Sequence, residues 1–307
     1  MTGSWIEGLR NARMSGDGRE GWVKSSLLAG CLVAGSVMSA SASGPDPAFA
    51  SPWVTEQAAR ARVIAGGVAQ PGGAIAYAGL EIHLDDGWKT YWRNPGSSGV
   101  PPRIDFDGSE NLAKAELLFP APQRFKDRDG DTIGYKSAVV LPVALTAKDP
   151  SKPIVLKLSI EFGICREVCI PVQPTLSLVV PPDAARHPSG EHLPAALARV
   201  PQPNAGDVSA PRLDRVATTL AGAKPKIVID ATFPDGANAG DIFLEAPDGL
   251  WIPLATAAGK SPSGAHRFEV DLTDGADLAD LKGRSIRVTM VSDKGQSEAA
   301  FNVVEAR

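Results

Sequence analysis

The sequence predicts an all-β protein of two β-sandwich domains, joined by a Pro/Ala-rich linker that holds one short helix. Three observations favour this fold class. The chain of 307 residues is about twice the length of an ordinary domain. Its 31 glycines and 26 prolines interrupt the chain often. The segments between these breaks alternate apolar and polar residues, as half-buried strands do.

The N-terminal segment has the layout of a secretory signal peptide. An apolar stretch runs from Ser25 to Ala42 and follows four basic residues. Small residues at its end predict cleavage after Ala42, with cleavage after Ala50 as the alternative. The stretch is short and rich in small residues for a spanning helix, so we expect no stable membrane span in the mature chain.

A lipoprotein signal is a weaker alternative for the same segment. The residues from Leu28 to Cys31 also fit the pattern that is cut before a lipidated cysteine. Only six residues separate Lys24 from Cys31, however, and the apolar run continues beyond it. Signal removal therefore also removes Cys31, and it leaves two cysteines in a protein that folds where paired thiols tend to oxidise.

Residues 51–182 are expected to form the first domain. Its clearest strands are predicted at Ile75 to Leu84, Ala138 to Leu145 and Ile154 to Phe162. In the last of these, apolar residues occupy every second position, which places them on one face of a strand. The same alternation resumes from Leu176 to Val180, so the cysteine segment is expected to connect two strands.

Residues 183–212 are rich in proline, alanine and polar residues and are expected to be the linker, with a short helix from Glu191 to Val200. Residues 213–307 are expected to form a second β-sandwich, in which turn signals separate the strands. These strands are predicted at Lys226 to Phe233, Asp241 to Glu245, Arg267 to Leu272 and Ser285 to Val291. This half of the chain holds no cysteine.

Composition and motifs exclude several function classes. The formal net charge is −4 and there is no long basic block, so nucleic acid is not an expected partner. The nucleophile motif of hydrolases, the phosphate-binding glycine loop and the Cys-x-x-Cys motif of thioredoxins do not occur. The chemistry that remains lies at Cys165 and Cys169.

The spacing of Cys165 and Cys169 limits what they can do. A fully extended segment would place their Cα atoms about 13–14 Å apart, whereas a disulfide needs about 4.4–6.8 Å. The segment must therefore fold back, which Gly163 and Pro171 allow. A ring this small restricts the unfolded chain far less than a long loop, which contributes about 3 kcal/mol or more. Spacing alone leaves a structural disulfide, a redox pair and a metal site open.

Copper binding is the metal alternative. The mature chain has four histidines, none close to the cysteines in sequence: His83, His187, His192 and His266. A Cu(I) site of Cys165, Cys169 and His83 would suit soft thiolate ligands. The Cys-x-x-x-Cys motif followed by proline also occurs in the Sco copper chaperones, but in a thioredoxin-like α/β domain that these strands do not suggest.

An aromatic window at Trp88, Tyr91 and Trp92 precedes a turn signal. Core and turn packing is one interpretation of this window. The other is an aromatic wall beside the disulfide that excludes water until a partner docks, to which Phe162 would also contribute.

The first domain resembles the N-terminal periplasmic domain of DsbD-type protein-disulfide reductases, and the ScsB (suppressor of copper sensitivity) branch looks most similar. The resemblance covers Ala74 to about Pro182. It rests on four motifs in the family's order: GWKTYWRNPG from Gly87, FPAPQRF from Phe119, GYKSAVVLPV from Gly134 and GICREVCIPV from Gly163. Beyond Leu213 it is weaker, although ScsB-like N-terminal regions also continue into a second β-domain.

The resemblance implies an immunoglobulin-like domain and a location in the bacterial periplasm. It implies that Cys165 and Cys169 form a disulfide that exchanges with partner thiols, with Cys169 as the exchanging cysteine and Cys165 as the resolving one. The cysteine spacing is shorter here than in the best-known members, so the two roles are open to exchange. Tyr91 resembles a family tyrosine near the site.

The family's membrane domain and thioredoxin-like domain have no counterpart in this sequence, so a separate electron donor is expected. The primary hypothesis is therefore a thiol–disulfide exchange protein. It would carry reducing equivalents from a thioredoxin-like or membrane donor to a disulfide-containing periplasmic client, and it would need no cofactor. The alternative is a non-catalytic copper-binding or adaptor protein with a structural disulfide.

Overall fold

The computed structural model describes residues 49–66, 75–96, 98–127, 130–187, 192–204, 206–235, 237, 240–273 and 275–305. Contacts divide the chain into Met1–Ala42 and Ser43–Arg307, and every described residue belongs to the second unit. The predicted signal peptide, its cleavage after Ala42 and the lipidation of Cys31 lie outside these residues. Within them, no helix is long and apolar enough to span a membrane.

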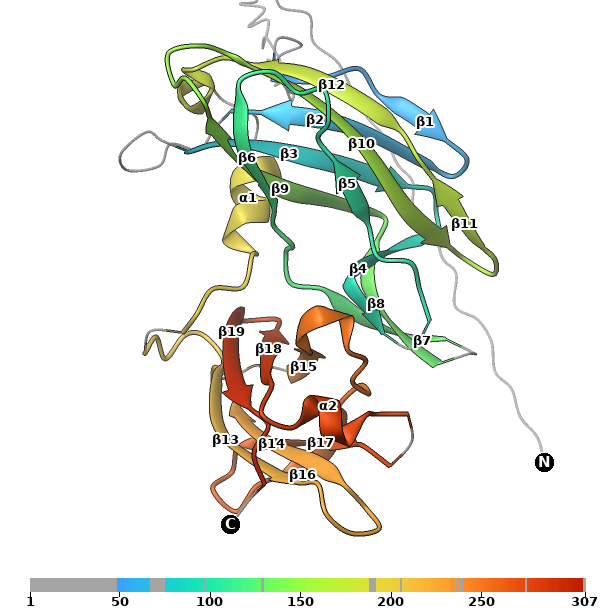
Figure 1. The fold of residues 1–307 in the computed structure, drawn as a ribbon, viewed down its shortest axis with the longest axis vertical. Helices are drawn as coiled ribbons and strands as arrows, with labels where there is room; N and C mark the ends of the chain where they lie inside the picture. The colour runs from blue at the N-terminus through green and yellow to red at the C-terminus, as the bar shows by residue number, and fades with distance from the viewer. Residues whose placement is uncertain are drawn as a thin grey trace, which may run out of the picture. The chain divides into compact units, whose positions relative to one another are not determined.

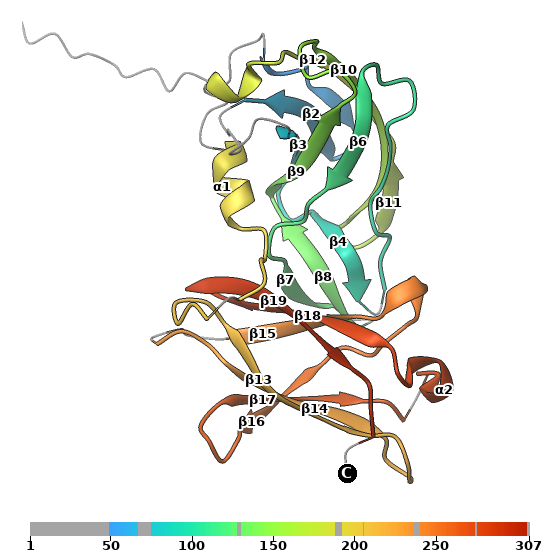
Figure 2. The same ribbon diagram turned by 60° about the vertical axis from the view of Figure 1, so that its left-hand side comes forward.

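Four antiparallel sheets account for most of the described residues (Figures 1 and 2), which confirms the mostly-β prediction. The first sheet has the order β1-β2-β3-β9-β6. Its strands are β1 (Val54–Glu56), β2 (Ala59–Ala65), β3 (Ile75–Leu84), β9 (Ala138–Ala147) and β6 (Leu112–Leu117). The predicted strand at Ile75 to Leu84 has the bounds that the structure gives to β3.

The second sheet carries both cysteines and has the order β11-β10-β4-β8-β7, with β5 and β12 also paired to β10. Its strands are β4 (Lys89–Gly96), β5 (Arg103–Asp105), β7 (Gln123–Asp127), β8 (Gly130–Lys136), β10 (Ile154–Cys165), β11 (Cys169–Val172) and β12 (Thr175–Val180). The long strand β10 is the common partner of four other strands. It therefore connects the cysteine segment directly to the central part of the sheet.

The alternation predicted for β10 is present. Ile154, Leu156, Leu158, Ile160 and Phe162 are each at most 3% exposed, while Lys157 between them is exposed. This buried row joins residues of the first sheet in one hydrophobic core. The strand runs three residues beyond the predicted end at Phe162, as far as Cys165.

The C-terminal part of the chain has its own pair of sheets and its own core. The sheet β13-β14-β17-β16 consists of β13 (Arg212–Thr219), β14 (Lys226–Thr232), β17 (His266–Asp271) and β16 (Thr256–Lys260). The sheet β15-β18-β19 consists of β15 (Gly240–Glu245), β18 (Ser285–Ser292) and β19 (Gly295–Asn302). All the strands predicted between Lys226 and Val291 are present in these two sheets.

The described helices are short. They are η2 (Ala184–Arg186), α1 (His192–Ala198), η3 (Pro247–Gly249) and α2 (Leu278–Leu281). Helix α1 falls inside the range predicted for the helix between the two β-rich parts. Its Leu193 is fully buried, and its His192 bonds to Glu81 of β3. The helix is therefore attached to the first sheet.

Candidate functional site: a disulfide at the tip of a β-hairpin

Cys165 and Cys169 close the tip of the hairpin that β10 and β11 form (Figure 1). They are direct cross-strand partners, with Cα atoms 4.1 Å apart, and they are joined by a disulfide. Gly163 and Pro171 face each other two steps further from the tip, beyond the pair of Ile164 and Ile170. The chain therefore reverses in the three residues between the cysteines, and a short strand not predicted from the sequence follows the turn.

The two cysteines differ in exposure. Cys165 is only 9% exposed, whereas Cys169 and the three turn residues before it are exposed. Val168 at the turn is 69% exposed, although it is apolar. An incoming thiolate therefore finds Cys169 more accessible than Cys165.

Tyr91 of β4 contacts the disulfide directly. Its hydroxyl lies 3.1 Å from the Sγ atom of Cys169, and because a disulfide sulfur carries no hydrogen, the hydroxyl is the donor. Tyr91 is 2% exposed. This burial, together with the nearby negative charge of Asp127, raises the pKa of Tyr91 above its ordinary value. The phenol therefore stays protonated and able to donate at neutral pH.

Two glycines make room for the Tyr91 ring. A Cβ atom on Gly99 would come within 2.7 Å of two ring carbons, and one on Gly163 within 3.1 Å of a third. The second is tighter than ordinary carbon contacts and the first is a clash. Val100 lies beside Gly163 as well. Glycine at these positions lets the backbone enclose the ring that holds the hydroxyl on Cys169.

Lys89 is the next residue in the row of cross-strand partners that Cys169 and Cys165 begin. Cys165 pairs with Lys89 of β4, and Lys89 pairs with Lys136 of β8. Direct cross-strand partners project from the same face of a sheet, so two basic side chains share the face of the disulfide. The Lys89 ammonium donates to the carboxylate of Asp127 and, at 2.9 Å, to the hydroxyl of Thr132.

Asp127 is the acidic partner of that row. Its burial raises the pKa of the carboxyl, but hydrogen bonds from Lys89 and Thr132 and the charge of Lys89 lower it by more. The pKa of Asp127 is therefore below its ordinary value. The carboxylate is ionised at neutral pH and compensates the charge of Lys89.

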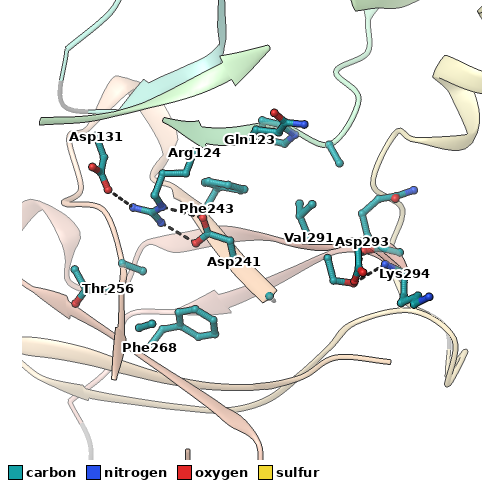
Figure 3. A pocket seen from close by; sticks show the side chains of 18 of the residues that line it. Gln123, Arg124, Asp131, Asp241, Phe243, Thr256, Phe268, Val291, Asp293 and Lys294 are labelled. Atoms are coloured by element: carbon teal, nitrogen blue, oxygen red, sulfur yellow. Dashed lines mark hydrogen bonds and ion pairs between the residues drawn. The ribbon is translucent and has the colours of Figure 1, made fainter. Parts of the chain in front are cut away.

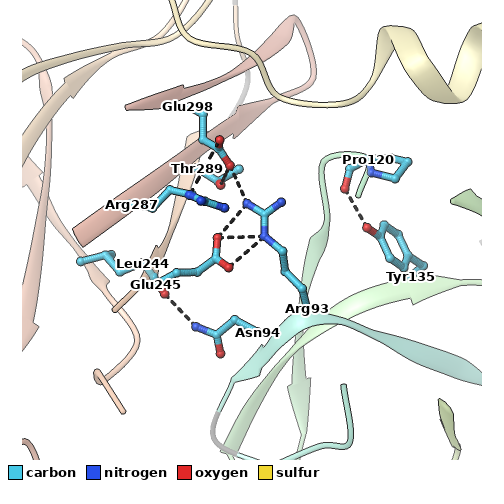
Figure 4. Close-up of polar contacts among 9 residues, drawn as sticks. All are labelled: Arg93, Asn94, Pro120, Tyr135, Leu244, Glu245, Arg287, Thr289 and Glu298. Carbon is cyan, nitrogen blue, oxygen red and sulfur yellow. Dashed lines mark hydrogen bonds and ion pairs between the residues drawn. The ribbon is translucent and has the colours of Figure 1, made fainter. Parts of the chain in front are cut away.

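The other end of β4 is fixed by the C-terminal sheets (Figure 4). Arg93 donates to both carboxylate oxygens of Glu245, at 2.7–3.0 Å, and also bonds to Glu298. The next residue, Asn94, donates to the carbonyl oxygen of Leu244 at 2.7 Å. Because Tyr91 is two residues before Arg93, these contacts hold the strand that presents the Tyr91 hydroxyl.

A second link involves Arg124 of β7. Its guanidinium makes two 2.8 Å hydrogen bonds with Asp241 of β15, and it pairs with Asp131 (Figure 3). These residues line a pocket of about 1200 Å³ that Phe243 and Phe268 also line. The charge of Arg124 is thus compensated by two carboxylates.

The aromatic residues considered in the sequence lie in different environments. Trp92 and Phe162 are at most 1% exposed and belong to the core. Trp88 is partly buried, and the guanidinium carbon of Arg166 lies 5.6 Å from the centre of its ring. Among these side chains Tyr91 is the one with a hydrogen bond to the cysteine pair.

His83 lies in the first sheet, whereas the cysteines lie in the second. Its ring nitrogens contact Glu81 at 3.1 Å and Arg60 at 3.3 Å, and it packs against Trp53. Among the described residues, no three His, Cys, Asp or Glu side chains form a group suited to a metal ion. The structure therefore does not bring His83 to Cys165 and Cys169.

Sequence reasoning named Tyr91 and Gly163, but it missed Lys89, Asp127 and Lys136 as neighbours of the disulfide. Lys89 and Tyr91 alternate in the strand after Gly87, so they share a face, but the partner of that face follows only from the pairing of β4 with β10. Asp127 and Lys136 both lie more than 35 residues after Lys89 in the sequence. No local pattern identifies such neighbours.

Comparisons with known proteins support the resemblance. Residues 63–181 match the family described as "Thiol:disulfide interchange protein DsbD, N-terminal". The fold is similar to the crystal structure of the N-terminal periplasmic domain of ScsB from Proteus mirabilis. The TM-score is 0.64 at 21% identity, over 84% of this chain and 99% of that one.

A second structure gives a weaker match. It is the Neisseria meningitidis DsbD N-terminal domain in the reduced form, with a TM-score of 0.23 at 18% identity, over 44% of this chain and 88% of that one. A search of curated proteins found no significant match.

Proposed function

Because residues 63–181 match the DsbD N-terminal domain family, we propose that this chain is a periplasmic thiol–disulfide exchange protein. It accepts reducing equivalents from a thioredoxin-like or membrane donor and passes them to a disulfide-containing client. Such a protein acts as a thiol–disulfide oxidoreductase and uses no cofactor. Both of its β-rich parts are immunoglobulin-like sandwiches in this proposal.

The observation that carries the proposal is the environment of Cys169. This residue is exposed at a hairpin tip, and its sulfur accepts a hydrogen bond from a buried tyrosine. A purely structural disulfide that closes such a short ring would stabilise the fold only a little. A structural disulfide would also need no hydrogen-bond donor directed at one of its sulfur atoms. An exchanging disulfide needs both accessibility and a group that stabilises developing thiolate charge.

The first half of the relay reduces the disulfide. A donor thiolate attacks Sγ of Cys169, the Cys165–Cys169 bond breaks, and its electron pair leaves on Sγ of Cys165. The second donor thiol then attacks the mixed disulfide and releases Cys169. The donor dithiol becomes a disulfide, and Cys165 and Cys169 become thiols.

The second half reduces the client. The thiolate of Cys169 attacks a client disulfide and expels one client sulfur as a thiolate. Cys165 then attacks Sγ of Cys169 and expels the other client sulfur, which restores the disulfide. The Tyr91 hydroxyl stabilises negative charge on Cys169 in both halves, and Lys89 and Arg166 lie on the side of Cys165, where charge develops in the first step.

The reduction potential tests this proposal. Purified protein is equilibrated in glutathione buffers and its free thiols are labelled and counted by mass spectrometry. We expect a midpoint above about −300 mV, because structural disulfides lie below that value. A midpoint far below it contradicts the relay and supports the structural alternative.

Trapping variants assign the two cysteines. Cys165→Ser leaves Cys169 without its resolving partner, so mixed disulfides with a thioredoxin-like protein are expected to persist. Cys169→Ser is the matched control and is expected to trap much less, because Cys165 is buried. Stoichiometric Cu(I) binding by the reduced protein, without exchange activity, would instead favour the copper alternative.

A further inference from the structure

A pocket of about 310 Å³ opens beside Cys165, between the cysteine hairpin and the strands β4, β7 and β8. We name it the basic pocket. Its charged lining consists of Lys89, Arg124, Lys126, Asp127, Lys136 and Arg166. Five of these six side chains are cationic, although the whole chain has a net charge of −4.

Two of the five cations are already compensated. Lys89 binds Asp127, and Arg124 binds Asp131 and Asp241. The other three, Lys126, Lys136 and Arg166, are exposed. None of the three forms an ion pair with a carboxylate of the residues that the structure describes. Within the part of the chain that the structure describes, the charges of these three cations beside the disulfide are therefore not compensated by an ion pair.

The position of Arg166 is set by its surroundings. It follows Cys165 directly, and its guanidinium lies against the Trp88 ring. Its Cδ atom is 3.2 Å from the point where a Cβ of Gly87 would be, and Gly87 has a φ of +82°. The glycine turn before β4 therefore leaves room for the arginine side chain at the rim of the pocket.

We propose that the basic pocket binds a carboxylate of the protein that donates the electrons. This carboxylate lies within one or two residues of the donor's exchanging cysteine. This inference rests on the proposed exchange function and names the chemistry of its partner. Cys165 lines the pocket, and the Cα atom of Cys169 is 4.1 Å from that of Cys165. Because a chain spans at most about 3.6 Å per residue, a carboxylate near the attacking thiolate reaches the pocket.

The basic pocket and the partner's carboxylate have opposite charges, and this affects how fast and in which orientation the two proteins associate. Opposite charges around the reacting groups raise association rates and orient the partner. The bond changes are those of the first half of the relay, with the mixed disulfide at Cys169. The pocket adds no chemical step. It favours thiols with a neighbouring carboxylate over other thiols in reaching the disulfide.

Three peptide probes test the inference on the oxidised full-length protein. They are acetylated, amidated tripeptides with a central cysteine between two glutamates, two glutamines or two lysines. Two peptide thiols reduce one Cys165–Cys169 disulfide and end as a peptide disulfide. The second-order rate constant, divided by the thiolate fraction of each peptide, is measured at low ionic strength.

We expect the glutamate peptide to react about tenfold faster than the glutamine peptide, and the lysine peptide to react more slowly, as for electrostatic steering. The double variant Lys136→Gln/Arg166→Gln should reduce the preference to about twofold or less. In 1 M salt, where the Debye length is about 3 Å, the three rates should converge for the unmodified protein.

The control variant is Lys148→Gln/Lys157→Gln. It removes two exposed lysines from the same part of the chain, and Lys157 lies eight residues before Cys165 in β10. It should keep the preference for the glutamate peptide, because it changes the net charge equally but leaves the basic pocket intact.

The outcomes separate the inference from the function on which it rests. Equal rates for the three peptides at low salt, or a preference that survives Lys136→Gln/Arg166→Gln, overturn the pocket assignment while exchange itself stands. A disulfide that none of the three peptides reduces overturns both.

Discussion

The Tyr91 hydroxyl donates a hydrogen bond to Sγ of Cys169 across 3.1 Å, from a strand that is 78 residues away in sequence. Burial keeps this phenol protonated, since it raises the pKa of Tyr91. The bond therefore links the core of the second sheet to the exposed sulfur. Its loss should affect exchange more than it affects the fold.

Tyr91→Phe removes this donor and keeps the ring between Gly99 and Gly163. We expect the rate of disulfide exchange to fall by up to about tenfold, because a hydrogen bond contributes about 0.5–1.5 kcal/mol and 1.4 kcal/mol corresponds to tenfold. The measurement is the rate of reduction by dithiothreitol. Tyr135→Phe is the matched control, since it removes a hydroxyl bonded to the carbonyl oxygen of Pro120 (Figure 4). It should lower stability and leave exchange unchanged.

Gly163→Ala should displace the Tyr91 ring, because the added methyl group would lie 3.1 Å from a ring carbon. We expect slower exchange, close to that of Tyr91→Phe, and a loss of stability of about 1–3 kcal/mol from overpacking. The double variant with Tyr91→Ala provides the control. If Gly163→Ala slows exchange equally in that background, its effect does not pass through Tyr91.

Arg93→Gln should weaken the contact between β4 and the C-terminal sheets. It removes the partner of Glu245 and Glu298, whose side chains are 17% and 21% exposed. We expect a loss of about 2 kcal/mol in the free energy of unfolding, as for a hydrogen-bonded charge that is largely buried. Urea denaturation followed by tryptophan fluorescence measures it.

The control for Arg93→Gln is Lys114→Gln. Lys114 and Glu116 are 69% and 55% exposed, and exposed pairs contribute about 0–1 kcal/mol. An equal effect of the two variants would mean that the Arg93 cluster does not stabilise β4.

Glu81→Gln should destabilise the first sheet. The Glu81 side chain is 2% exposed and binds Arg62, His83 and His192. Burial raises the pKa of Glu81, but the hydrogen bonds from Arg62 and His192 and the charge of Arg62 lower it below 4.5. Removing one partner of a buried ion pair costs about 3 kcal/mol or more at neutral pH.

The pH dependence of that loss has a definite sign. A carboxyl whose pKa is lower in the folded state contributes stability that is complete above its unfolded pKa, near 4.5, and is lost as pH falls through the folded value. The difference between wild type and Glu81→Gln should therefore shrink below pH 4.5. A difference that stays constant from pH 7 to pH 3, measured by urea denaturation, would contradict the assignment.

Local patterns in the sequence predicted many of the strands well. In β10 the alternation is strong, because one face lies in the core and the other is exposed or partly exposed. In β3 the residues from Ala78 to Ile82 are all buried, so both faces of its central part are covered. Longer strands such as β4, β13 and β19 were not predicted. The short strands β5 and β11 carry too little alternation to be predicted, since they have three or four residues. Their strand geometry is supplied by pairing with β10.

The sequence by itself determined that the protein is mostly β, and it singled out Cys165 and Cys169 as the candidate site, because alternation and cysteine spacing are local properties of the chain. Only the tertiary structure decided what surrounds the disulfide. Tyr91 contacts it, and Lys89 and Lys136 share its face of the sheet, through the pairing of β4 with β10 and of β8 with β4. That pairing depends on which apolar faces share a core, and residues far apart in the sequence set it together.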